Sequence, residues 1–419
     1  MDDLLLMATS TKEMEIQADC IKRVSLEWGF VINSGKTQIA TASNQKRTLA
    51  AARKIWGIKT LNKTIKYLGV HIQPANNLGK AHWEERMKKA LDSYHMLKGA
   101  GMKWAEMDYQ INLQLYDHVI KPTMIYGSEI TEPSETQLQK INDLQAKMMK
   151  EIIGAKRNTN NRWTLWETGK QTAQTMIEEG KLRLAMKIIR KPTNSLIGRI
   201  RRQLKQENSD LNIIKRAKEI AKEWKTTHWL DPETTTPKGS KRWRDQRDTA
   251  IIARETQRFR TWARPQGTPT KYFQIKPWFG VNDMITGLHS TREAKAILMT
   301  RANRIGVGDD PTLHKSSETN KCEQCGKTIK DTLEHALWTC ENEGSIRERD
   351  TLHFHLEQIY EGETAWEEFE HKTPEEKTIQ ILAVRKHPSP EEEDKKIRAW
   401  EALFSFLQLI QKQRKFQDF

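Results

Sequence analysis

The chain has 419 residues, a formal net charge of +15 at pH 7, and 30% charged against 37% hydrophobic residues. This length suggests two to four domains, and the basic balance favours a polyanionic partner. No stretch approaches the roughly eighteen apolar residues of a membrane span, the start lacks the basic residues of a signal peptide, and four cysteines do not make a disulfide framework. We therefore expect an intracellular protein, nuclear or cytoplasmic, with no membrane partner.

The first residues carry two adjacent acids before an apolar run. Asp2 and Asp3 precede Leu4–Ala8, a pattern that predicts a turn running into a buried strand. Carboxylates held in this way can bind Mg²⁺, which prefers oxygen ligands. A solvated chain tip is the alternative, because Asp-Asp pairs are common. A helix is predicted next over Ser10–Trp28, ended by Gly29.

Two further segments are predicted to form strands. Residues 29–39 predict a strand, a turn and a second strand, and residues 65–72 predict another strand. A phosphate-binding P-loop at Gly35-Lys36-Thr37 is excluded, because the glycine it needs five positions before Gly35 is Phe30.

The order of these segments resembles the last part of the palm of a non-LTR retrotransposon reverse transcriptase. The matching residues are Asp2 and Asp3 of the aromatic-x-Asp-Asp motif, then Gly29, Phe30, Asn33, Lys36 and Thr37, then Tyr67, Leu68 and Gly69 of the Tyr-Leu-Gly motif. The resemblance implies RNA-directed DNA polymerase activity in target-primed reverse transcription, with RNA and DNA as partners.

The resemblance also implies roles for single residues. Asp2 and Asp3 would hold Mg²⁺ at the primer end, Lys36 would protonate or neutralise the leaving group, and Tyr67-Leu68-Gly69 would grip the primer. The family's third carboxylate and fingers lie upstream of the Asp-Asp hairpin, where this chain begins, so we expect no polymerase activity from this chain alone. A non-catalytic, zinc-containing nucleic-acid-binding protein and a decayed reading frame remain the alternatives.

Residues 78–155 predict a helical thumb. Helices are expected from about Ala81, from Ala105 to Lys121 with an end before Pro122, and from Ser134 to Ile152 behind a capping box. The stretch Lys121–Glu129 contains the Pro-x-x-x-Tyr-Gly pattern that recurs in the family's thumb.

Residues 156–229 predict a basic, helical connecting region whose cations suit contacts to nucleic acid. The candidate contacts are Lys181, Arg183, Lys187, Arg199, Arg201 and Arg202, with Trp163, Trp166, Trp224 and Trp229 available for stacking. A solvated helix face with core tryptophans is the alternative. Residues 230–282 carry many prolines and glycines and predict a linker with a basic helical insert.

The strongest local motif is Cys322-x₂-Cys325-x₉-His335-x₄-Cys340. Three thiolates and one imidazole at this spacing can converge on Zn²⁺, and four protein ligands leave no open position for water, so the zinc would be structural. The segment also resembles the Cys-Cys-His-Cys motif downstream of the polymerase in the same family.

Together these features predict an α+β, mostly helical fold. The expected parts are a partial palm (1–76), the thumb (78–155), the basic connection (156–229), the linker (230–282), a zinc-knuckle module (283–345) and a helical tail (346–419). Within the tail we expect an acidic break at residues 388–394, followed by an amphipathic helix that packs on a partner or on the body of the protein, there most simply on the zinc module.

Overall fold

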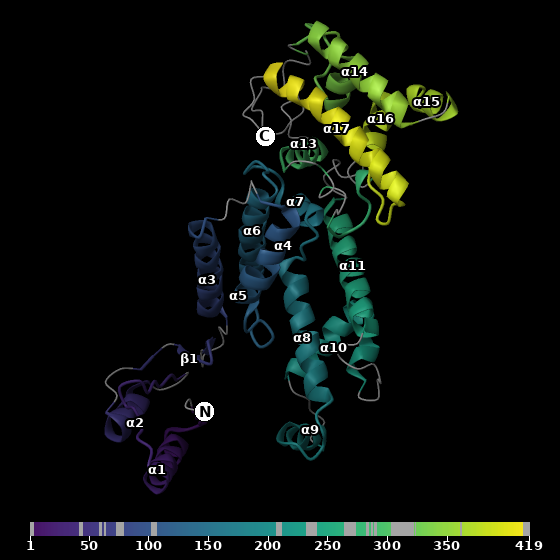
Figure 1. Cartoon of the computed structure of the whole chain (residues 1–419). Coiled ribbons are helices and arrows are strands. Elements are labelled where there is room, and N and C mark those ends of the chain that lie inside the picture. Colours follow the sequence, from purple (N-terminus) through teal and green to yellow (C-terminus); the bar gives the residue numbers. More distant parts are fainter. Residues whose placement is uncertain are drawn as a thin grey trace.

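The structure, a computed structural model, describes residues 4–41, 45–57, 61–62, 64–72, 79–101, 107–206, 212–231, 241–263, 274–281, 285, 288, 291–302, 322, 324–360 and 363–413. Within these ranges the chain is mostly helical, as predicted, and its paired strands form one short hairpin (Figure 1). Asp2 and Asp3 lie outside the described residues.

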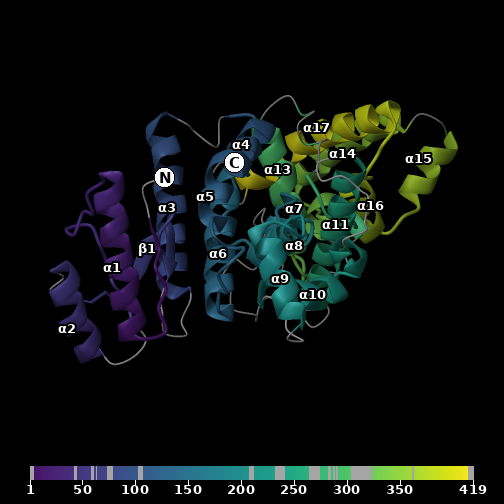
Figure 2. The same ribbon diagram turned by 90° about the horizontal axis from the view of Figure 1, so that it is seen from below.

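The elements are, in chain order, α1 (Thr11–Trp28), α2 (Gln45–Trp56), β1 (Ile65–Tyr67), β2 (Val70–Ile72), α3 (Lys80–Gly99), α4 (Tyr109–Leu115), α5 (Lys121–Ile125), α6 (Glu135–Ile152), α7 (Asn161–Glu167), α8 (Ala173–Ile189), α9 (Leu196–Gln206), α10 (Asn212–Glu223), α11 (Lys241–Ala263), α13 (Thr291–Arg301), α14 (Glu343–Ile359), α15 (Glu363–Glu370), α16 (Pro374–Leu382) and α17 (Pro390–Gln413). Tyr116–Ile120 and His335–Thr339 form π-helical turns, and Thr227–Leu230 forms a 3₁₀ turn. Helices α1 and α2 lie on one side of α3, away from the later helices (Figure 2).

Helix α1 confirms the first helix prediction. The Ser10 side chain accepts a hydrogen bond from the Glu13 backbone N–H at 3.2 Å, and Gly29 ends the helix at φ +70°. The strands predicted over residues 4–8 and 29–39 are wrong, since these residues form no strand and residue 40 makes only an isolated bridge to residue 62. An extended apolar segment becomes a strand only beside a partner, and Val31 remains 93% exposed.

The segment predicted as one strand at residues 65–72 is a hairpin. Strand β1 pairs antiparallel with β2, so that Tyr67 faces Val70. Leu68 at φ +46° and Gly69 at φ +79° make the two-residue turn, which requires positive φ at both positions. Glycine adopts this conformation freely, whereas Leu68 carries the steric cost of its Cβ.

The central helices share a continuous apolar core that begins in α3. Trp83, Tyr94, Tyr116, Met124 and Ile141 are fully buried in it. Helix α6 is capped as predicted, by reciprocal hydrogen bonds between residues 134 and 137. The core continues through α7 to α17 without a break, so the helices from α3 onward form one packed body.

The helix predicted to stop before Pro122 does not stop there. It continues through a π-helical turn at Tyr116–Ile120 into α5, with Pro122 in the first turn of α5. A proline has no N–H to donate and its ring disturbs the preceding helical turn. A wider π turn immediately before the proline relieves both problems, which explains why the chain stays helical to Ile125.

Gly169 connects α7 to α8 where two backbone segments meet. It has φ +62°, and a Cβ added there would lie 2.6 Å from the carbonyl carbon of Gly280 and from the nitrogen of Val281. We expect Gly169→Ala to lower the free energy of unfolding by about 2–4 kcal/mol, from left-handed strain plus the clash with backbone. Denaturant titration followed by tryptophan fluorescence measures this loss.

The matched control is Gly57→Ala. Gly57 has φ +67°, and nothing lies within 4 Å of an added Cβ, so that only the strain of about 1–2 kcal/mol remains. Equal losses at the two positions would show that the approach of residues 169 and 280 contributes nothing.

The C-terminal helices pack around α17. Trp400, Leu403 and Leu407 of α17 are buried against α14, α13 and α16, which confirms that the amphipathic helix packs on the body of the protein. The predicted break lies earlier than expected, at residues 383–389 between α16 and α17, and its acids lie instead in the first turn of α17. There Ser389 accepts from the Glu392 backbone N–H at 3.2 Å, and acids at a helix start are favoured by the helix dipole.

Candidate metal centre and basic surface

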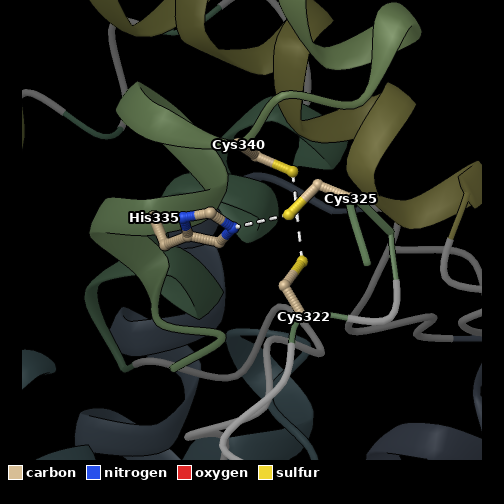
Figure 3. A group of neighbouring side chains, drawn as sticks. All are labelled: Cys322, Cys325, His335 and Cys340. Carbon is tan, nitrogen blue, oxygen red and sulfur yellow. Dashed lines mark hydrogen bonds between the residues drawn. The ribbon is translucent and has the colours of Figure 1, made fainter. Parts of the chain in front are cut away.

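The four residues of the cysteine–histidine motif come together. The Sγ atoms of Cys322, Cys325 and Cys340 and the Nε2 atom of His335 all lie within 4.8 Å of one another, and all four point toward a common centre (Figure 3). The Cys322 and Cys340 sulfurs are 4.0 Å apart, and the Cys325 sulfur is 3.5 Å from Nε2. The predicted convergence is confirmed, and this group could hold a metal ion.

Two local turns aim these ligands. After Cys325 the chain reverses at Gly326, φ +73°, whose N–H donates to the Cys322 carbonyl at 2.9 Å, and the Cys322 N–H donates to the Lys327 carbonyl at 3.1 Å. In the π-helical turn the Cys340 N–H donates to the His335 carbonyl at 2.8 Å. These backbone hydrogen bonds form the two turns that carry the four ligands.

The imidazole of His335 is oriented by a hydroxyl on the same turn. Its Nδ1 lies 2.9 Å from the Thr339 Oγ1, which leaves Nε2 directed at the sulfurs. Such a contact on the second ring nitrogen fixes the ring orientation of a ligating histidine. The sequence analysis missed Thr339, although a hydroxyl four residues after a helical histidine is a readable signal.

The thiols respond differently to their surroundings. Burial raises the pKa of Cys322 to about 12. Burial acts in the same direction on Cys325, but hydrogen bonds from the Lys327 backbone and from Cys322 outweigh it and lower the pKa of the Cys325 thiol. Three sulfurs and one imidazole form a soft donor set that suits Zn²⁺, which would keep the thiols deprotonated.

Arg349 links the cluster to α14. Its guanidinium donates to the Cys340 carbonyl at 2.6 Å and to the Leu337 carbonyl at 3.0 Å. A site with three thiolates and one divalent metal carries a net charge of −1, which a neighbouring guanidinium offsets. No spacing rule in the sequence assigns Arg349 to these carbonyls of the motif.

The structure describes only some of the residues that resemble the polymerase motifs. Lys36 is exposed in the turn that follows Asn33, and its backbone N–H donates to the Asn33 carbonyl at 3.1 Å. Because Asp2 and Asp3 lie outside the described residues, the role predicted for Lys36 stays a prediction.

The Tyr67-Leu68-Gly69 turn is held by Arg86 of α3 and by Tyr126, which follows α5. The Tyr126 hydroxyl donates to the Leu68 carbonyl at 2.8 Å, and Arg86 donates to the Gly69 carbonyl at 3.2 Å. The Arg86 guanidinium also lies 5.2 Å from the centre of the Tyr126 ring. The two segments with family resemblance, Tyr67–Gly69 and Tyr126-Gly127, are therefore in direct contact, which the sequence did not reveal.

The predicted nucleic-acid contacts divide into buried and exposed residues. Lys181 is buried and forms an ion pair with Glu132, and burial lowers the pKa of Lys181 while that partner opposes the shift. Buried and paired in this way, Lys181 offers no exposed charge for a phosphate contact. Arg201 donates to the Ile189 carbonyl at 2.7 Å and completes the end of α8, so that its main contact is structural.

The remaining candidates face outward. Lys187, Arg199 and Arg202 are exposed and Arg183 is half-buried. Helix α10 buries its apolar face on α8 and directs further lysines outward at residues 215, 218 and 222. Residues 181–225 hold fourteen Lys and Arg residues against four Asp and Glu residues, so this end of the molecule is strongly basic.

The tryptophans of this region are core residues. Trp163, Trp166, Trp224 and Trp229 are all less than 9% exposed, and Trp166 stacks on Phe259 at 4.3 Å between ring centres. Their predicted stacking on bases is wrong, and the alternative of buried tryptophans is correct. The basic surface can therefore offer charge without aromatic platforms.

Comparison of the whole chain with models of protein families, with curated proteins and with solved structures gives no match in any of the three. Among the described helices, none combines the length and the apolar character needed to cross a membrane.

Proposed function

We propose that this chain is the C-terminal portion of a non-LTR reverse transcriptase and that it binds nucleic acid through its basic helices. The observation that carries the proposal is the contact between Tyr67–Gly69 and Tyr126-Gly127. These stretches resemble the palm and the thumb of one family and lie about sixty residues apart in the sequence. Their contact supports the proposal, because two parts of one polymerase domain are expected to pack together.

The cysteine–histidine cluster would hold one structural Zn²⁺. All four ligands come from the protein, so the ion would stabilise the fold and would have no open position for a substrate. By the resemblance, Mg²⁺ would belong to Asp2 and Asp3, where it would supply electrostatic stabilisation of phosphoryl transfer. The described residues offer binding and positioning, and we propose no catalytic step for them.

Binding should occur through phosphates. Exposed Lys187, Arg199 and Lys205 carry charge near the α8–α9 corner, and the nearby tryptophans are buried. Such a surface contacts the backbone of RNA or DNA with little dependence on sequence. A retained, non-catalytic nucleic-acid-binding protein is the second candidate function, because these cations are independent of the palm residues.

Binding can be measured by fluorescence anisotropy with a single-stranded RNA over a series of salt concentrations. We expect Lys187→Ala/Arg199→Ala/Lys205→Ala to weaken binding of all sequences alike and to reduce the slope of log K against log salt by about 2, at about 0.7 per phosphate contact. The control Lys386→Ala/Arg398→Ala/Lys412→Ala removes the same charge from exposed sites near the C-terminus and should change little.

Equal effects of the two triple variants would contradict the assignment of this surface. Primer extension distinguishes the two candidate functions: Mg²⁺-dependent synthesis by the chain joined to its upstream coding sequence supports the reverse transcriptase proposal, and synthesis by this chain alone would overturn our expectation that it is inactive.

A further inference from the structure

Helix α9 combines exposed cations with exposed apolar side chains. Leu196 is 67% exposed, Ile200 is 42% exposed, and the two lie four residues apart on one helical face. Arg199 and Arg202 are exposed beside them. Phosphate contact explains the cations, but it does not explain an apolar stripe in water.

The opposite side of α9 attaches it to the molecule. Gly198 packs on the backbone of the preceding turn, where a Cβ would lie 2.2 Å from the Pro192 carbonyl oxygen, and Arg201 donates to the end of α8. Leu196 and Ile200 lie about 160° around the helix from Gly198. The apolar stripe therefore points away from the contacts that fix α9.

Helix α14 carries a complementary stripe. Ile346 is 40% exposed and Phe354 is 55% exposed, two turns apart, with exposed Asp350 between them. Exposed Glu343 and Glu357 extend this stripe at its ends. Arg347 is also exposed beside it, so the acids exceed the base by two.

The two stripes match in charge as well as in apolar character. The region around α9 is basic, whereas residues 341–419 hold 12 Lys and Arg residues against 18 Asp and Glu residues. Helices α9 and α14 lie at opposite ends of the molecule, so they cannot meet within one chain (Figure 1). We propose that α9 of one chain docks on α14 of a second copy, with Leu196 and Ile200 against Ile346 and Phe354.

This contact joins two different surfaces, so each docked pair leaves one α9 and one α14 free. Such a heterologous interface continues into longer assemblies unless it closes into a ring. A contact between two single helices is smaller than the roughly 1,200 Å² of a stable interface, so the association should be weak and sensitive to salt.

Sedimentation velocity of the full chain, free of nucleic acid, tests the proposal at low salt. We expect mass to increase with concentration beyond that of a dimer. Ile200→Glu blocks the α9 stripe and Phe354→Lys blocks the α14 stripe, and each variant alone should associate at least about tenfold more weakly. A mixture of the two variants retains one good α9 and one good α14, so it should form 1:1 dimers and nothing larger.

The control is Gln206→Glu, which adds the same charge to α9 away from the stripe and should keep at least about a third of the affinity. Circular dichroism and metal content show whether each variant is folded, and both substitutions are at exposed positions. A monomer at every concentration would overturn the proposal, as would association lost in Ile200→Glu but intact in Phe354→Lys. Nucleic-acid binding is measured separately, so either proposal can fail without the other.

Discussion

Substituting one metal ligand, Cys325→Ser, should remove the bound metal and unfold the segment between Cys322 and Cys340. Serine has nearly the same size, but its hydroxyl is not deprotonated at neutral pH and does not replace a thiolate on Zn²⁺. Small zinc modules obtain much of their folding free energy from the ion, with apparent binding free energies of about 10–16 kcal/mol. Three residual ligands would not retain it stoichiometrically.

Three measurements follow the effect of this substitution. Metal analysis of the purified chain should find about one zinc in the wild type and none in the variant. Amide hydrogen exchange should rise in the motif and in α14, which Arg349 connects to the motif, and should stay low in α6. Chelation of the wild-type protein should reproduce the variant's exchange pattern.

The control is Cys20→Ser. Cys20 is an exposed thiol on α1, outside the motif, so this variant should keep its zinc and its exchange pattern. Wild-type protein without stoichiometric zinc would contradict the structural role. Loss of zinc from Cys325→Ser without faster exchange would show that the metal is bound but does not stabilise the fold.

Removing the positive partner of a fully buried ion pair, Arg301→Met, should lower the free energy of unfolding by about 3–5 kcal/mol. Arg301 in α13 lies 3.1 Å from the Glu167 carboxylate in α7, and both side chains are 0% exposed. Burial lowers the pKa of Arg301, and the nearby Glu167 opposes that shift. Without the guanidinium, the carboxylate would remain buried without its charge partner. Denaturant titration measures the loss.

Two further variants test the cause. The double variant Glu167→Met/Arg301→Met removes both charges and should recover most of the loss, because two apolar side chains can replace a buried pair. Arg385→Met breaks an ion pair with Glu392 in which the arginine is 77% exposed, and it should cost less than about 1 kcal/mol. A double variant as unstable as Arg301→Met would show that shape, and not charge, determines the effect.

Local signals explain most of what the sequence predicted correctly. Ser10 and Ser134 begin helices because a hydroxyl can accept from the backbone two or three residues later, whatever surrounds it. The four metal ligands converge because a Cys-x₂-Cys turn and one helical turn need few distant contacts. These patterns lie within about twenty residues of chain, so local turns and hydrogen bonds are enough to form them.

The errors share a dependence on distant partners. Lys181 appears as one of many cations in the sequence, but its side chain is buried and pairs with the exposed Glu132, forty-nine residues away. The extended segment at Val31 has the composition of a strand, yet no neighbouring strand is present among the described residues. The pair between Glu167 and Arg301 joins residues 134 positions apart, and no spacing rule predicts it.

The position of α17 in the chain affects when the metal can enter. The ribosome delivers Cys340 sixty residues before Trp400, a delay of about 3–12 s at 5–20 residues per second. During that interval the four ligands are already synthesised, whereas α14 still lacks the helix that covers its apolar face. A nascent chain could thus bind a metal ion at these four ligands before α17 docks on α14.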